Sequence, residues 1–369
     1  MPTITTIRLE TCRFEREPAL LLEHGGLCAH VFRYRSGVCA VKLTNAEGNL
    51  VVLPYQGQQI WSMDFAGRSL AMKSTFDEPQ ETRDFLSTYG AFLLHCGMRA
   101  MGNPGKADDH PVHGELPNAP FQDAWLRAGE DTEGAYLEIG GSYRHTLAFT
   151  CDYRVETAVR LYEQATTVRI TVSLTNLRSE PLEYMYLAHL NFRPVDYGRL
   201  VYSAPNGEGQ VGMRQPNPEL ISRNPAYGAF IDKVAKNPAL IDVLDPTFPI
   251  NPEIVLNYRY VADEEGWAHS MQVRPDGYAD YVKHRPDELP QVVRWIARTG
   301  HEQALGLALP ATATAEGYSA EKRKGNVRQL ASHQSISFHY EAGLLSPEQT
   351  ADMERRITSI LNAEDAERL

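Results

Sequence analysis

The sequence lacks the long apolar run and the basic excess that would point to a membrane or to nucleic acid. No stretch approaches the roughly 20 apolar residues that a membrane-spanning helix needs, and charged residues interrupt the N-terminal segment before a secretory signal could form. Lys and Arg number 36 against 47 Asp and Glu, a net charge of −11. Because phosphates and anionic membrane surfaces require basic patches, we expect neither nucleic acid nor a membrane as a partner.

Cysteine is scarce, and its spacing fits neither a disulfide framework nor a metal site. The chain has an odd number of cysteines and no CxxC pair. This pattern favours free thiols in a reducing compartment, so we expect a cytoplasmic protein. The five residues are Cys12, Cys28, Cys39, Cys96 and Cys151.

A regular alternation of strands and helices is also missing, which disfavours a doubly wound parallel sheet. Short β-branched or alternating runs recur instead, such as "TTVRITVSLTN" and "VVRWIAR", separated by turns such as "NAEGN" at 45–49 and "RPDG" at 274–277. Many short strands with turns between them predict an all-β sandwich or barrel. Since we find no repeat or clear linker, we expect one domain over residues 1–369, with an N-terminal strand or hairpin over residues 1–30.

Few segments predict helices. Residues 77–90 could form a short surface helix, and the Pro-interrupted connection 217–244 predicts two or three short helical turns, in a long connection of the kind that often covers a binding site. A C-terminal helix is predicted over residues 346–366. There Ser346 suits the N-cap, Pro347 the first helical position and Gln349 the capping-box position.

The stretch "HPVHGELPNAPFQ" places two histidines three residues apart, at His110 and His113. Three interpretations compete: a metal site, an acid/base site, and a solvated loop. Pro111 and Gly114 disfavour the helix on which the two rings could share a face. Zinc or iron would need further ligands at a recognisable spacing, and none is obvious, so we assign no metal ligand.

A second histidine lies in "TVSLTNLRSEPLEYMYLAHLNFRP", residues 171–194. The pattern predicts a strand pair whose second strand carries His189. With the two-residue period of a strand, His189 and Asn191 share a face. A lone histidine there would most simply be a core residue satisfied by a carbonyl, but the neighbouring Asn191 and the separate His113-Gly114 loop favour a functional site.

The order of these motifs resembles the aldose 1-epimerase (galactose mutarotase-like) superfamily, especially its divergent branch. The series runs from "CGMRAMGNPG" at 96–105 through His113-Gly114 and the strand pair with Asn176, His189 and Asn191 to Arg294-Trp295, and spans roughly residues 30–345. The resemblance implies a large antiparallel β-sandwich whose concave face binds a sugar or sugar derivative. It also implies interconversion of sugar anomers by acid/base catalysis without a cofactor.

Interconversion of anomers requires one group that protonates the ring oxygen and another that takes the proton of the anomeric hydroxyl, and such help is typically worth ~10²–10⁴-fold. The resemblance makes His189 the acid, His113 a sugar-binding histidine that we also count among the catalytic candidates, and Arg99 a sugar-binding arginine. Sugar hydroxyls also suit Asn191 and Asp280. A Trp is expected against the C–H face of the sugar, with Trp295 our choice among Trp61, Trp125, Trp267 and Trp295.

One position departs from the family pattern. The family base is a glutamate in a late strand, but the matching stretch reads Gly306 to Pro310, with Leu309 at the carboxylate position. Glu316 downstream is our candidate substitute, with Asp280 and Glu115 as further acids. Three hypotheses follow: an aldose 1-epimerase-like enzyme, a carbohydrate-binding protein without turnover, and a metal-dependent sugar isomerase or lyase that uses His110 and His113.

Overall fold

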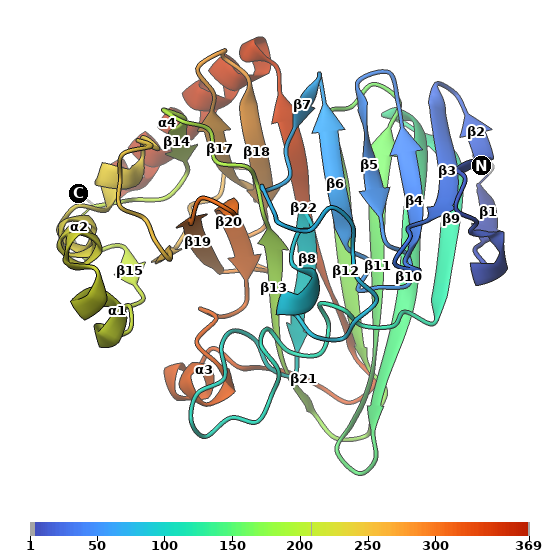
Figure 1. The fold of residues 1–369 in the computed structure, drawn as a ribbon, viewed down its shortest axis with the longest axis horizontal. Coiled ribbons are helices and arrows are strands. Elements are labelled where there is room, and N and C mark those ends of the chain that lie inside the picture. The colour runs from blue at the N-terminus through green and yellow to red at the C-terminus, as the bar shows by residue number, and fades with distance from the viewer. Residues whose placement is uncertain (1–3, 208, 368–369) are drawn as a thin grey trace.

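Two large antiparallel sheets face each other and enclose the core (Figure 1). The computed structural model describes residues 4–207 and 209–367. The all-β sandwich predicted from the sequence is confirmed, and so is its C-terminal helix.

Nine strands form one sheet. In spatial order they are β1 (Thr5–Arg8), β9 (Asp123–Asp131), β10 (Gly134–Leu147), β11 (Cys151–Tyr162), β12 (Thr167–Asn176), β22 (Ser335–Leu345), β18 (Ala279–His284), β17 (Ala268–Val273) and β14 (Arg199–Tyr202).

The second sheet is larger and carries two short side strands. Its spatial order is β15 (Gly212–Met213), β16 (Ile254–Tyr258), β19 (Gln291–Arg298), β20 (Gln303–Ala311), β13 (Leu182–Leu190), β8 (Leu93–Met98), β6 (Ile60–Phe65), β5 (Gly48–Val52), β4 (Cys39–Thr44), β3 (Leu27–Arg33) and β2 (Ala19–His24). The short strand β7 (Arg68–Ser69) pairs with β6, and β21 (Arg328–Leu330) pairs with β13.

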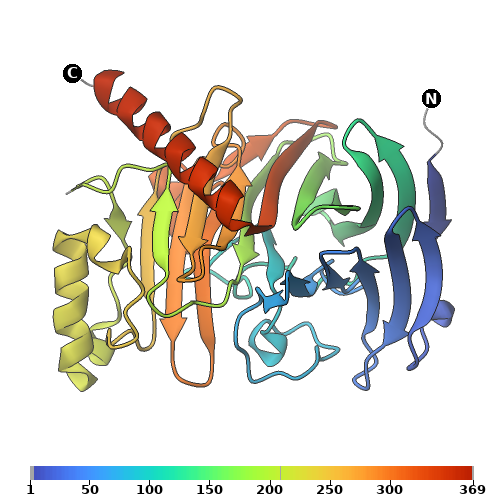
Figure 2. The ribbon, with the colours of Figure 1, turned by 90° about the horizontal axis from the view of Figure 1, so that it is seen from above.

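Helices lie at the margins of the sandwich. The α-helices are α1 (Pro218–Arg223), α2 (Pro225–Lys236), α3 (Tyr318–Lys324) and α4 (Pro347–Glu367), and the 3₁₀ turns are η1 (Thr11–Arg13), η2 (Leu86–Thr88) and η3 (Pro238–Ile241). Figure 2 shows α4 lying diagonally along one side of the two layers. Ile357 of α4 packs with Met271 and Tyr281, so the helix covers the outer face of β17 and β18.

The helix expected over residues 77–90 is wrong, because only the single turn η2 forms there. The Asp84 carboxylate accepts hydrogen bonds from the backbone N–H and the hydroxyl of Ser87, and Gln80 N–H donates to the Thr88 hydroxyl. Such side-chain bonds to nearby backbone compete with the helical ladder. The segment is therefore a packed loop, held by local polar contacts.

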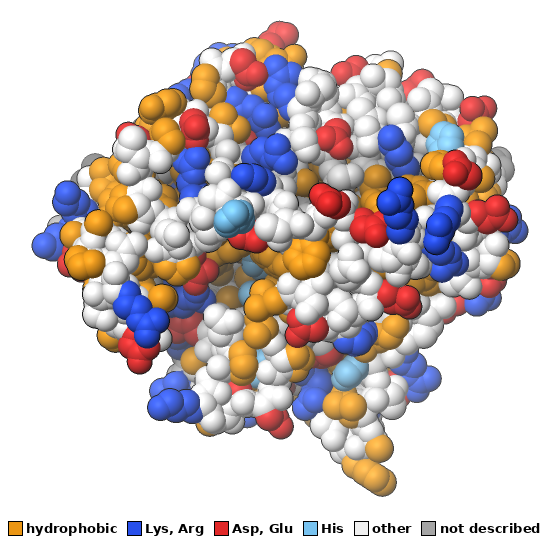
Figure 3. Space-filling view, viewed as in Figure 1, with side chains coloured by type: hydrophobic (Ala, Val, Ile, Leu, Met, Phe, Trp, Pro, Cys, Tyr) orange, Lys and Arg blue, Asp and Glu red, His pale blue; other side chains and the backbone are white. Residues whose placement is uncertain are grey.

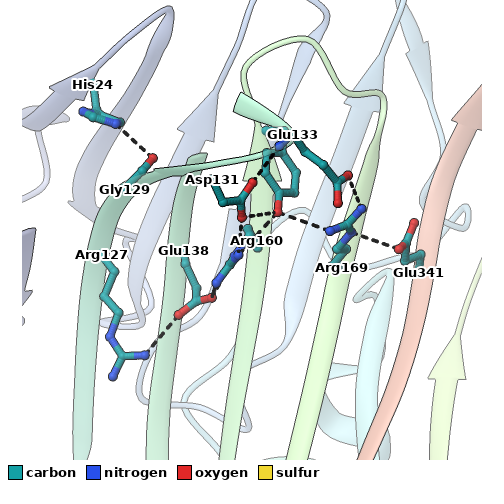
Figure 4. Close-up of polar contacts among 10 residues, drawn as sticks. His24, Arg127, Gly129, Asp131, Glu133, Glu138, Arg160, Arg169 and Glu341 are labelled. Carbon is teal, nitrogen blue, oxygen red and sulfur yellow. Dashed lines mark hydrogen bonds and ion pairs between the residues drawn. The ribbon is translucent and has the colours of Figure 1, made fainter. Parts of the chain in front are cut away.

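A row of alternating charges crosses the outer face of the nine-stranded sheet (Figure 4). Glu138 on β10 pairs with Arg127 on β9 (3.1 Å) and with Arg160 on β11 (2.8 Å), and Arg169 on β12 pairs with Glu341 on β22 (3.0 Å). Cross-strand pairs of opposite charge contribute roughly 0.2–1 kcal/mol each. Because successive side chains of a strand point to opposite faces of the sheet, this face is polar while the opposite face packs into the core.

Candidate active site

A cavity of about 190 Å³ opens on the larger sheet where four neighbouring strands present side chains to it. Glu253 lies directly before β16, Trp295 lies on β19, Leu309 on β20 and His189 on β13. The strands pair in that order, and the register sets Val255 opposite Trp295. Figure 3 shows the surface hollowed near the middle of this face, with hydrophobic and histidine side chains visible inside. We call this space the site cavity.

The loop that carries His113 is fixed in an unusual backbone conformation. His113 has a φ of 59°, and its backbone N–H donates to Gly102 O (3.0 Å). The next residue, Gly114, has a φ of 82°, and a Cβ there would lie 2.2 Å from Ala100 O. Only glycine fits so close an approach at positive φ. The His-Gly pair therefore has a physical reason: Gly114 lets the loop turn tightly enough to aim His113 into the site cavity.

His189 is held as a neutral ring with one defined tautomer. Asn191 Nδ2 donates to Ala91 O (3.0 Å), so its Oδ1 faces His189 Nδ1 at 2.8 Å. We assign the proton from this network: Nδ1 carries the hydrogen and donates it to Asn191, which leaves Nε2 as an acceptor. Burial lowers the pKa of His189 to about 4, partly offset by the bond to Asn191. The ring is thus an uncharged proton acceptor near neutral pH.

His113 lies beside His189 and has the complementary hydrogen-bonding pattern. Their ring centroids are 5.2 Å apart, and Phe85 packs against His113 at 5.0 Å. Burial, with the neighbouring His189 second, lowers the pKa of His113 well below its usual value. Its buried Nδ1 has no partner among the described residues. Since a buried N–H without an acceptor is rarer than an unsatisfied acceptor, we assign the hydrogen to Nε2, which can donate to a ligand.

Sequence reasoning missed the third polar group, an ion pair between Arg214 and Glu253. Trp295 Nε1 donates to the other carboxylate oxygen of Glu253 (2.6 Å), and the Trp295 ring lies edge-on to His189 with centroids 5.3 Å apart. Among the described lining residues, Glu253 is the only carboxylate. No local signal in "NPEIVLNY" marks it. Arg214 and Glu253 lie at the two ends of the connection that holds α1 and α2, so this connection begins and ends at the site cavity.

Of the residues predicted from the sequence, His189, His113, Trp295 and Leu309 line the site cavity together. Asn191 is buried directly behind it and holds His189. The other tryptophans lie elsewhere: Trp61 is buried in a separate apolar cluster, Trp125 stacks under Arg127, and Trp267 stacks under Arg285 and Lys283.

Three predicted polar residues are not brought to the site cavity. Arg99 lines a second, larger cavity together with Glu115. Asp280 is fully buried on β18, in the other sheet, where it pairs with Arg274 at 2.6 Å. Glu316 pairs with Lys324 at 2.7 Å and is absent from the described lining of either cavity.

His110 and His113 point into different spaces. His110 lines the second cavity, where its Nε2 accepts from Tyr318 N–H (3.3 Å), whereas His113 lines the site cavity. The two rings therefore do not face one shared space. Within the described ranges, no cluster of three or more His, Cys, Asp or Glu side chains is arranged to hold a metal. In the same ranges, no helix is long and apolar enough to cross a membrane.

Comparisons by sequence match only part of the chain. A family model described as a domain of unknown function (DUF4432) matches residues 35–196, less than half of the chain. No curated protein matches the sequence.

Solved structures give a fuller likeness. A candidate aldose 1-epimerase from Klebsiella pneumoniae superposes with a TM-score of 0.79 at 17% identity, over 97% of this chain and 96% of that one. A galactose mutarotase-like protein from Clostridium acetobutylicum gives 0.56 at 11% identity, over 90% and 99%. A candidate aldose 1-epimerase from Escherichia coli gives 0.52 at 15% identity, over 82% and 98%. The chain therefore shares the fold of these solved aldose 1-epimerase-like and galactose mutarotase-like structures, as its motif order implied.

Proposed function

We propose that this protein interconverts the anomers of a sugar by proton transfer in the site cavity, without a cofactor. One observation carries the proposal. A proton acceptor (His189), a hydrogen-bond donor (His113), an ion pair (Arg214 with Glu253) and an aromatic ring (Trp295) come from five separate parts of the chain and line one cavity. Acid/base chemistry on a sugar needs that combination: proton handling, polar contacts to hydroxyls and an apolar face.

The proton step follows from the state of His189. Its neutral Nε2 takes the proton of the anomeric hydroxyl, and the electrons of that O–H bond form the aldehyde carbonyl. The bond between the anomeric carbon and the ring oxygen breaks, and the ring oxygen takes the proton from the new imidazolium. Because burial lowers the pKa of His189 to about 4, the imidazolium is a ready donor. This role differs from that of the charged acid that the family resemblance implies.

The opened sugar must be held while its aldehyde group rotates to present its other face to the ring oxygen. His113, as a neutral Nε2–H donor, can bind the aldehyde oxygen without becoming charged, a use of imidazole known where the ring pKa is depressed. Arg214 can bind a further oxygen, and Glu253 keeps its guanidinium in place. Trp295, anchored to Glu253 by its indole N–H, offers its ring to the C–H side of the sugar. Closure on the other face then reverses the proton step.

The second candidate function is sugar binding without turnover. Leu309 favours it, because a side chain that cannot take a proton stands where the family has its base. The rate of anomer exchange distinguishes the two candidate functions.

Exchange spectroscopy by NMR on a panel of aldoses and uronates measures the rate at which α and β anomers interconvert. The enzyme proposal expects exchange above the buffer rate for at least one sugar, lowered by ~10²–10⁴ in His189→Asn, which removes the acceptor. The matched control is His301→Asn, an exposed histidine, which should leave the rate unchanged. Sugar binding with no exchange above buffer would favour the binding protein, and exchange that survives His189→Asn would end the assignment of His189.

A further inference from the structure

The second cavity is large and lies behind the wall of the site cavity. It measures about 720 Å³. The chain from 110 to 113 separates the two spaces: His110 and Pro111 line the second cavity, while Val112 and His113 line the site cavity. The tip of the β10–β11 hairpin forms part of its rim through Leu147 and Thr150. Nothing in the proposed anomer chemistry uses this space.

Polar groups with free bonding capacity line its inner part. The Arg99 guanidinium has no hydrogen bond or ion pair with any described residue, although the residue is half buried. His145 bonds Tyr143 through Nδ1 (2.8 Å), which leaves its Nε2 open. Glu115 Oε1 accepts from the N–H groups of Met98 and Arg99, and its second oxygen has no partner in the described part of the chain. A donor, an acceptor and a ring nitrogen thus remain for a ligand.

The tip of the hairpin beside this cavity carries apolar groups in an unfavourable setting. Leu147, which lines the cavity, is 41% exposed, and Phe149, between the lining residues Leu147 and Thr150 but not itself in the lining, is fully exposed. Phe149 also has a φ of 62°, a left-handed conformation that bulky residues rarely adopt. Neither the exposure nor the backbone conformation stabilises the free protein. Strained, exposed residues of this kind cluster at ligand clamps.

We propose that the second cavity is a binding site for a neutral saccharide unit, separate from the site cavity. Arg99, Glu115 and His145 would bind its hydroxyls, and the Phe149 ring, which follows the lining residue Leu147 by two positions, would turn over the cavity to cover its C–H face. An anion is disfavoured because the carboxylates of Asp108, Asp109, Glu115 and Glu183 outnumber the single guanidinium in the lining. A polyol, by contrast, can donate to carboxylates and accept from Arg99 at once. This proposal does not rest on the proposed catalytic function.

Methyl glycosides of glucose, galactose and mannose are suitable probes, because their blocked anomeric oxygen prevents turnover at the site cavity. Calorimetric titration of the full-length protein should show binding that persists in His189→Asn. Phe149→Gly should weaken this binding by about tenfold or more, as expected for loss of a contact residue. Since glycine adopts a φ of 62° without strain, the variant should keep the thermal midpoint of the wild type. Arg99→Gln should weaken binding similarly, whereas Phe149→Tyr should retain it.

Three results would overturn the proposal: no binding of any methyl glycoside, binding that both Phe149→Gly and Arg99→Gln leave unchanged, or binding that His189→Asn alone abolishes. A further arm tests the charge argument with glucuronate and glucose 6-phosphate. Tight binding of these anions that depends on Arg99, without binding of the neutral glycosides, would replace the saccharide site with an anion site.

Discussion

The chemistry open to His189 is decided by a neighbour that never reaches the cavity. Asn191 is buried, and its amide is oriented by Ala91 O, so it can only accept from His189 Nδ1. Tyr89 donates to the same Asn191 oxygen (3.2 Å), which fixes the amide further. The histidine and asparagine can be recognised in the sequence, but the tautomer cannot, because it depends on which amide atom faces the ring.

The pH dependence of exchange tests this role directly. If neutral His189 accepts the first proton, the rate should be flat above about pH 5 and fall as pH drops through about 4, the pKa that burial gives this residue. The acceptor form is fully present above that pKa and is lost below it. Anomer exchange measured between pH 3.5 and 8, corrected for the buffer rate, gives the profile. A rate that rises steadily as pH falls from 8 to 4 would instead support the imidazolium as the acid.

Glu253 can be tested for two roles: positioning Arg214 and Trp295, or transferring the proton itself. In our mechanism it holds Arg214 and Trp295, so Glu253→Gln should raise KM by about tenfold through lost ligand contacts and change kcat little. Steady-state kinetics on the best sugar separates the two parameters. Glu316→Gln is the matched control, because that carboxylate pairs with Lys324 outside the cavity. A fall in kcat by a factor of about one hundred or more would make Glu253 the missing base.

The positions of the strands could be predicted from the sequence more readily than the pairing of the strands in the sheet. An alternating run marks β12, because the two-residue period reflects a buried and an exposed face. Apolar runs bounded by turns mark β13 and β20, because both strands are buried along nearly their whole length. Glu253 was missed because its position depends on β16 pairing with β19, two strands separated by more than thirty residues in sequence. Pairing between distant strands is fixed by the packed sheet rather than by any local pattern, so the strands could be predicted while the ion pair of the site could not.

In the polar segments, composition alone does not distinguish a helix from a loop. Residues 77–90 have a composition that suits a helix, yet Asp84 and Thr88 bond the local backbone and only one turn forms. The connection 217–244 does form short helices, because Asn217 and Asn224 cap them and prolines stand at their first positions. Capping residues therefore separated the right prediction from the wrong one.

Strand β20 offers a test of the departure from the family pattern. Leu309 is buried and lines the site cavity. In the pairing of β19 with β20 it lies opposite Val293. Leu309→Glu restores the family residue but places a carboxylate in an apolar position that lacks the partners of a native buried charge. We expect a loss of about 3–5 kcal/mol in the free energy of unfolding, measured by urea denaturation. Leu309→Met, which conserves volume, should cost less than about 1.5 kcal/mol. A stable Leu309→Glu with faster exchange would contradict this and return the base to β20.

At the scale of the whole molecule, the sandwich buries several histidines away from both cavities. His95 and His284 are buried, and burial lowers the pKa of each to about 3. His95 bonds Tyr186 (2.7 Å), whereas neither nitrogen of His284 has a partner among the described residues. The motif order could predict the fold because it records the succession of strands, but it carries no information on such buried rings, whose environment is created by both sheets together.

Because of these buried histidines, the free energy of unfolding is expected to fall as the pH is lowered. Their folded pKa lies below the value of 6.5 expected when unfolded, so the unfolded chain binds more protons as pH falls. The stabilising difference is therefore fully present above about pH 6.5 and is lost as pH drops toward the folded values, at up to ~1.4 kcal/mol per pH unit for each histidine. His284→Phe keeps an aromatic ring against Tyr260 and removes one titrating group. The free energy of unfolding, measured by urea denaturation between pH 7 and 4.5, should then fall less steeply by about that amount, with stability at pH 7 retained or raised. The exposed control His301→Phe should leave the slope unchanged, and an unchanged slope in His284→Phe would show that the acid sensitivity arises elsewhere.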